Sequence, residues 1–117
     1  MVDNIYPEAA EEGLVKANME KLVYYAATSP EKLDRIGEYL AHRIGRDIYR
    51  ARGGFVEVGM EAVDQLLMAC QAQTLNLFVE SYLKTVEALL ESQDTNLHVL
   101  ASESFRQFSK KVSKSAK

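Results

Sequence analysis

Few side chains in this sequence have the type and spacing that catalysis or metal binding requires. Cys70 follows an apolar run, which is typical of a small buried hydrophobe, because a reactive thiol needs an electropositive and partly exposed setting. His42 and His98 lie far apart on separate predicted helices, and neither belongs to a cluster with metal-ligand spacing. Gly53-Gly54 has no Lys-Ser/Thr partner downstream, so it is no phosphate loop. We therefore expect no catalytic set, no cofactor and no metal site.

Three acidic residues share one arc of a predicted helix: Glu57, Glu61 and Asp64. Such an arc is compatible with a pair of carboxyls that share a proton, but it is more typical of a solvated acidic stripe. It can equally complement the basic face of a neighbouring helix or of a partner.

One group of basic residues is concentrated on a single face of a predicted helix. On a helical wheel its members fall within an arc of about 80°, with Tyr39 inside it and no acidic residue among them. The members are Lys32, Arg35, Arg43, Arg46 and Arg50. This basic stripe predicts contact with an anionic surface, where each basic group near an anionic leaflet contributes about 1 kcal/mol. The alternative is a solvated face paired with acidic neighbours. RNA is a weaker option, because only Tyr39 interleaves with the stripe.

Composition limits the classes of protein to which this chain can belong. The chain has 117 residues, 47% of them hydrophobic, with a net charge of −3. One domain with a single core is expected, and a generally basic nucleic-acid binder is excluded. One Cys excludes an intrachain disulfide scaffold. No apolar run approaches the length of about 18 residues that a membrane-spanning helix needs. The charge is unevenly spread, because residues 32–52 carry six basic and three acidic groups, whereas residues 53–91 carry one basic and six acidic.

Apolar spacing of three and four residues predicts helices almost throughout. Ser29 is expected to cap the second helix and Pro30 to occupy its first position. That helix is expected to end near Arg52, because Gly53-Gly54 breaks helices. The first expected helix starts at about Leu14 or Asn18 and ends at Ala27, after an irregular start at 1–13. The others cover about 30–52, 55–73, 75–90 and 95–108. The sequence predicts an all-α protein with about five helices, in a single helical-repeat domain at 1–108 and a frayed Lys/Ser-rich tail at 109–117.

Consecutive helices with short joints form either a bundle or a solenoid of stacked pairs. A HEAT-like repeat needs about 40 residues, and stable solenoids usually need at least about three repeats. A solenoid of HEAT/armadillo-like helix pairs therefore implies that this chain is the N-terminal piece of a longer rod.

Several uninterrupted segments match a known family in the right order. They are Val2-Asp3-Asn4-Ile5-Tyr6-Pro7-Glu8, Gly13 to Leu22, Pro30 to Gly37, Met60 to Cys70 and Asn76 to Ser81. Together they closely resemble the N-terminal region of the Eighty-five Requiring, or rolling blackout, family, over about Val2 to Phe108. The resemblance implies a HEAT/armadillo-like rod that is peripheral to the cytoplasmic face of the plasma membrane.

The resemblance also implies a function and partners. Family members recruit a type III alpha phosphatidylinositol 4-kinase with its accessory subunits, which sustains phosphatidylinositol 4-phosphate synthesis. The basic stripe then falls in the part of the rod expected to face anionic inner-leaflet lipids. The alternatives are a cytosolic helical protein-interaction module without lipid contact and, less favoured, a lipase-like enzyme. We expect a scaffold and not an enzyme, with no nucleic-acid partner.

The two ends of the sequence depart from the family pattern. The family's acylated, Cys-rich leader is expected before Val2, where this sequence has only Met1, and the pattern dissolves after Phe108. These departures predict a fragment, a short isoform or an incomplete gene model, with a cytosolic location if the leader is truly absent.

Overall fold

The protein consists of stacked antiparallel helices, as the sequence predicts. The computed structural model describes residues 2–69 and 75–115, and no strand occurs within these ranges. The helices are α1 (Lys16–Thr28), α2 (Leu33–Tyr49), α3 (Gly53–Ala69), α4 (Asn76–Glu91) and α5 (Thr95–Ser115). Short 3-10 turns precede α1 and α2, namely η1 (Val2–Ile5), η2 (Ala10–Glu12) and η3 (Pro30–Lys32).

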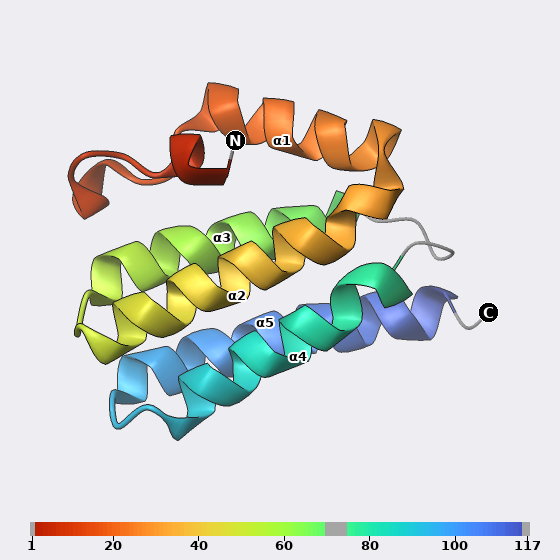
Figure 1. The fold of residues 1–117 in the computed structure, drawn as a ribbon. Helices are drawn as coiled ribbons and strands as arrows, with labels where there is room; N and C mark the ends of the chain where they lie inside the picture. Colours follow the sequence, from red (N-terminus) through yellow and green to blue (C-terminus); the bar gives the residue numbers. More distant parts are fainter. Residues whose placement is uncertain (1, 70–74, 116–117) are drawn as a thin grey trace.

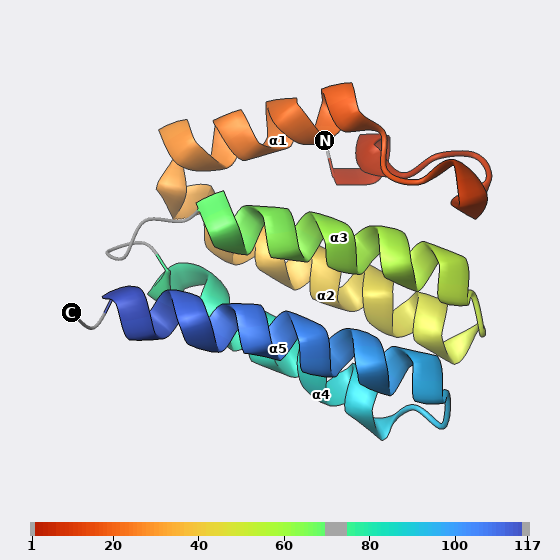
Figure 2. The same ribbon diagram turned by 180° about the vertical axis from the view of Figure 1, so that it is seen from behind.

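The helices form two layers. The hairpins α2/α3 and α4/α5 stack so that α2 packs on α4 and α3 packs on α5, while α1 lies against α3. Figure 1 shows the side on which α2 and α4 lie in front. Figure 2 shows the opposite side, where α1, α3 and α5 follow one another from top to bottom. The expected stacked helix pairs are therefore confirmed.

Local sequence signals explain several element ends. Pro30 lies at the start of η3, where its missing N–H costs no hydrogen bond, although the Ser29 side chain makes no capping bond there. Asp94 precedes α5, and its Oδ1 accepts a hydrogen bond from the Asn96 N–H at 2.9 Å. The expected start of the last helix at residue 95 is thus confirmed.

The turn between α2 and α3 differs from the expectation. Gly53 and Gly54 are the first two residues of α3, so they belong to a helix and are not what ends α2. The reversal occurs earlier, where the Ala51 N–H bonds the Ile48 carbonyl and the Arg52 N–H bonds the Asp47 carbonyl. This pair of bonds is a Schellman motif, which places Ala51 in the left-handed region at φ 57°. A helix can restart at Gly53 because this cap has already ended α2.

The C-terminal segment also differs from the expectation. α5 continues to Ser115, so residues 109–115 are helical and the expected frayed tail at 109–117 is wrong for these residues. Contacts with the rest of the fold explain the extension. Phe108 packs against the core, its ring 4.8 Å from that of Tyr82, and Lys111 Nζ donates to the Met68 carbonyl at 3.2 Å.

One contiguous apolar core lies between the layers. Leu40, Ile44, Met60 and Leu89 from α2, α3 and α4 are completely inaccessible to solvent. Close helix crossing requires Gly59, where a Cβ would lie 2.7 Å from Ile44 Cγ1. The helices therefore hold one another rigidly, and the side chains on their outer faces have defined positions.

Candidate functional site

The structure separates the members of the predicted basic stripe. Lys32 ends η3 and is half-buried, so it precedes α2 instead of lying within it. Arg35 and Arg46 lie on α2 and Arg50 directly follows it, and all three are exposed. Arg43 is largely covered, with only 18% of its side chain accessible.

Arg43 makes contacts within the protein. Its Nη1 lies 3.1 Å from Asp3 Oδ1, and its Nε lies 3.5 Å from Asp47 Oδ2. The guanidinium also lies over the Tyr6 ring, 3.7 Å from the centroid, which is a favourable cation–π distance. The side chain of Asp47 is only 1% exposed, so Arg43 supplies the positive charge beside a buried carboxylate. Arg43 is thus a structural residue that attaches the N-terminal segment to α2.

Tyrosines complete this attachment. The Tyr39 hydroxyl lies 2.8 Å from both carboxylate oxygens of Asp3, to which it donates, and this hydrogen bond is the main cause that raises the pKa of Tyr39. Burial raises the pKa of Tyr6 to about 12, although Arg43 partly opposes the shift. Tyr6 therefore stays neutral in the physiological range. The sequence showed Tyr39 within the stripe but not its partner Asp3, which lies 36 positions away.

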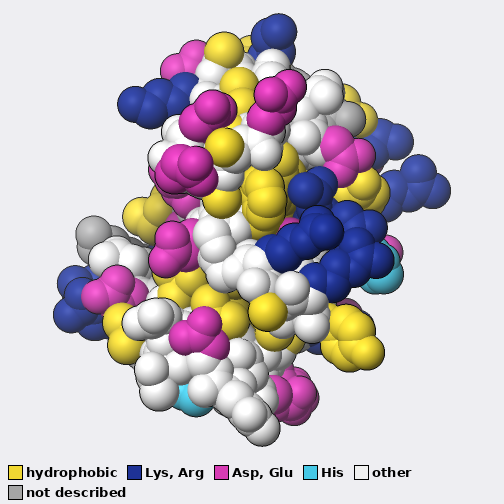
Figure 3. Space-filling model, turned by 90° about the vertical axis from the view of Figure 1, so that its left-hand side faces the viewer, with side chains coloured by type: hydrophobic (Ala, Val, Ile, Leu, Met, Phe, Trp, Pro, Cys, Tyr) yellow, Lys and Arg dark blue, Asp and Glu magenta, His cyan; other side chains and the backbone are white. Residues whose placement is uncertain are grey.

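Three arginines of the predicted stripe remain available on the α2 side. We call Arg35, Arg46 and Arg50 the free arginines, because none of them forms an ion pair with a side chain that the structure describes. Figure 3 shows Lys and Arg side chains gathered in a cluster on the end of the molecule that carries the α2–α3 turn. Exposed guanidiniums of this kind can bind phosphate or carboxylate groups at an anionic surface.

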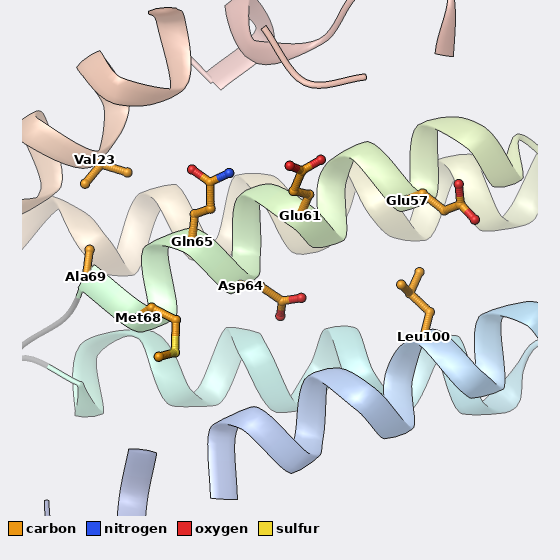
Figure 4. Close-up of a pocket in the computed structure, with 8 residues that line it drawn as sticks. All are labelled: Val23, Glu57, Glu61, Asp64, Gln65, Met68, Ala69 and Leu100. Carbon is orange, nitrogen blue, oxygen red and sulfur yellow. The ribbon is translucent and has the colours of Figure 1, made fainter. Parts of the chain in front are cut away.

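The acidic arc lies on the other layer. Glu57, Glu61 and Asp64 line an open groove along α3, between α1 and α5 (Figure 4). Asp64 Oδ1 accepts a hydrogen bond from Ser104 Oγ at 2.6 Å. The same Ser104 Oγ lies 2.8 Å from the Tyr82 hydroxyl. Burial raises the pKa of Asp64, and the negative charge of Glu61 adds to this, while the bond from Ser104 opposes it. The carboxylates therefore form a groove wall, and Asp64 is half-buried in it.

Other sequence expectations have simple outcomes. Cys70 lies outside the described residues. His42 is exposed, and His98 contacts the Ser92 carbonyl at the α4–α5 loop. In the part of the chain that the structure describes, no group of three or more His, Cys, Asp or Glu could hold a metal ion. No helix in that part is long and apolar enough to cross a membrane.

The arrangement of stacked helix pairs defines an all-helical repeat protein, and comparison identifies the repeat. Residues 19–116 match the family model described as EFR3, armadillo repeat. The chain is 60% identical over 108 residues to Protein EFR3 homolog B of Danio rerio, and 56% identical over 108 residues to Protein EFR3 homolog A of Homo sapiens. It is 56% identical over 109 residues to Protein EFR3 homolog cmp44E of Drosophila melanogaster. No solved structure matches the chain.

The chain therefore belongs to the EFR3 family, which confirms the predicted Eighty-five Requiring resemblance. The fold is an armadillo-like, all-α solenoid fragment. Each of the three alignments covers 92% of this chain and 13% of the relative. The chain thus spans about an eighth of the length of the relatives it matches.

Proposed function

We propose that this chain is a non-enzymatic, membrane-peripheral scaffold module that binds anionic lipids of the inner leaflet through the free arginines. In this proposal it helps to recruit or position a phosphatidylinositol 4-kinase complex at the plasma membrane, and so supports phosphatidylinositol 4-phosphate synthesis. Family membership supports the scaffold role. The observation that carries the lipid contact is that Arg35, Arg46 and Arg50 are exposed on α2 and its end without ion pairs in the described ranges.

The expected strength of this contact follows from the number of available charges. Each basic group near an anionic leaflet contributes about 1 kcal/mol, so three contribute about 3 kcal/mol, or roughly a hundredfold in partitioning. Lys32, which is half-buried at the end of η3, can add to this. Attachment of this strength is reversible and weakens with salt, since the charges are exposed. A second anchor is needed for stable residence.

Flotation of the purified chain with vesicles tests the lipid contact. Vesicles that contain phosphatidylserine and phosphatidylinositol 4-phosphate should carry the protein upward, whereas neutral phosphatidylcholine vesicles should not. The triple charge reversal Arg35→Glu, Arg46→Glu and Arg50→Glu should abolish the difference. Arg43 is left intact, because its replacement would disturb the fold.

A matched control separates the site from net charge. Lys21→Glu, Arg106→Glu and Lys110→Glu change the charge by the same amount at exposed positions on α1 and α5. This control should float as the unmodified chain does. Equal losses in both triple variants, or no loss in the first, would contradict the proposed lipid surface and favour a helical protein-interaction module.

A further inference from the structure

The groove along α3 is lined by acidic and apolar side chains, and the proposed lipid contact uses none of them. It encloses about 660 Å³ between α1, α3 and α5. Its lining residues come from α1, α3 and α5, the three helices that lie in front in Figure 2. Its lining combines the carboxylates of Glu57, Glu61 and Asp64 with the apolar side chains of Val23, Met68 and Leu100.

The carboxylates form a regular row. They are separated by four and three positions on α3, so they share one face and spread along about 10 Å of the helix axis. α3 contains no basic residue, and among the residues that the structure describes no Lys, Arg or His lines the groove. Among the side chains that the structure describes, up to residue 113, none of the three carboxylates has an ion-pair partner. Glu57 and Glu61 therefore present uncompensated negative charge to whatever occupies the groove, whereas Asp64 is half-buried and accepts the Ser104 hydroxyl.

Apolar surface lies beside this row and remains open to solvent. Met68 is 56% exposed, and Val23 and Leu100 from the neighbouring helices are half-buried. Figure 4 shows Val23 on the α1 side and Leu100 on the α5 side of α3. Methionine is flexible and polarizable, so it adapts to different apolar partners.

The C-terminal end of α3 already receives an ammonium group. Lys111 Nζ of α5 donates to the Met68 carbonyl at 3.2 Å, where the helix dipole favours a cation. The groove thus ends at a point where a lysine of the chain itself is accepted.

We propose that this groove docks a basic amphipathic helix of a partner protein. Lys or Arg side chains spaced four and three residues apart on that helix pair with Glu57, Glu61 and Asp64. Its flanking apolar residues cover Val23, Met68 and Leu100. The occupant is identified by its complementary charge and apolar surface. A helix that lies along α3 has the same rise per residue as α3, so its basic residues match the spacing of the carboxylates. The proposal is independent of the lipid contact.

A designed peptide tests this docking. The probe is a fluorescein-labelled, helix-forming peptide of about 14 residues, which is about 21 Å long. Three Lys residues are spaced four and three apart, with Leu residues beside them and Ala and Gln elsewhere. Fluorescence anisotropy measures binding at low salt. A second peptide carries Glu at the three Lys positions and should not bind.

Matched variants locate the binding. Glu57→Gln with Glu61→Gln should weaken binding about three- to tenfold, since each exposed ion pair contributes modestly. Glu87→Gln with Glu91→Gln makes the same charge change at exposed positions on α4 and should leave binding unchanged. The methyl NMR signals of Met68 and Leu100 should shift on titration, while vesicle flotation of both variants stays unchanged.

Three results would overturn the proposal. The first is no binding of the Lys peptide at low salt, and the second is equal weakening in the α3 and α4 variants. The third is binding that leaves the Met68 and Leu100 methyl signals unmoved. If the same methyl signals shift with protein concentration alone, a second copy of the chain fills the groove, and a partner helix is the wrong occupant.

Discussion

Replacement of Arg43 by alanine tests whether this residue is structural and not part of a free basic surface. The substitution removes the guanidinium from between Asp3 and Asp47 and from the Tyr6 ring. Among the described residues, neither carboxylate oxygen of Asp47 has a hydrogen-bond partner. The variant therefore leaves a buried carboxylate without its cation.

The expected loss of stability can be estimated contact by contact. Removal of one partner of a buried ion pair costs about 3–5 kcal/mol. The lower end applies here, because Arg43 is 18% exposed and its Nε is 3.5 Å from Asp47 Oδ2. The Asp3 pair contributes up to about 1 kcal/mol, since the side chain of Asp3 is 60% exposed, and the cation–π contact contributes about 1 kcal/mol. These terms overlap, so Arg43→Ala should lose about 3–4 kcal/mol.

Urea denaturation followed by far-UV circular dichroism measures this loss. A loss of 3 kcal/mol also lowers Tm by about 12 °C, at about 4 °C per kcal/mol for a domain of this size. Arg46→Ala is the matched control on the same helix, and it should change the free energy of unfolding by less than about 0.5 kcal/mol. Arg43→Met combined with Asp47→Leu should recover most of the loss, because no buried charge remains.

The outcome that refutes this reasoning is specific. If Arg43→Ala and Arg46→Ala change the free energy of unfolding equally, Arg43 does not compensate the buried Asp47. The same holds if the Arg43→Met/Asp47→Leu double variant is no more stable than Arg43→Ala. Arg43 would then be interpreted as a surface residue of the basic stripe.

Three further predictions concern the backbone at two positions and one buried tyrosine. Ala51→Gly should raise the free energy of unfolding by about 1 kcal/mol, because φ is 57° there; unchanged thermal melting would argue against strain. Gly59→Ala should cost about 1–3 kcal/mol, because a Cβ would lie 2.7 Å from a side-chain carbon of α2, whereas Gly45→Ala meets nothing within 4 Å and should not destabilise. Burial raises the pKa of Tyr82 from 10.0 to about 12, so the unfolded state loses this proton first. Stability should therefore fall between pH 10 and 12, by up to about 1.4 kcal/mol per pH unit for this group, and urea melts of Tyr82→Phe should show a shallower decline.

The helices were predictable because their apolar spacing is strong and their boundaries carry local signals. Asp94 acts within two residues of its own position, so the sequence alone shows where α5 begins. Pro30 was expected to open the second helix, but it opens the 3-10 turn η3, and α2 begins at Leu33. Gly53-Gly54 was misread because a glycine pair permits a turn without requiring one. The Schellman cap at Ala51 had already ended α2, and alanine gives no sequence signal for that conformation.

The role of Arg43 could not be predicted from the wheel. A wheel gives the direction of a side chain around its helix, but not what packs there from elsewhere in the chain. Asp3 lies 40 positions from Arg43, and only the folded N-terminal segment brings the two together. The same limit applies to the acidic arc, whose residues were evident from their spacing. The walls that make it a groove come from α1 and α5.

The positions of the two charged surfaces have a consequence for how the proposed contacts combine. The free arginines lie on α2 or directly after it, whereas the carboxylate row lies on α3 in a groove that residues of α1 and α5 also line. α2 lies in front in Figure 1 and α3 in Figure 2. An anionic membrane attracts basic helices as strongly as it attracts the arginines, so it would compete with the groove if both faced the same way. Because a Debye length is only about 8 Å at physiological salt, opposite faces act independently. Charge reversal of the free arginines should therefore abolish vesicle flotation and leave the affinity for the Lys peptide unchanged. Coupled losses would show that a single surface serves both ligands.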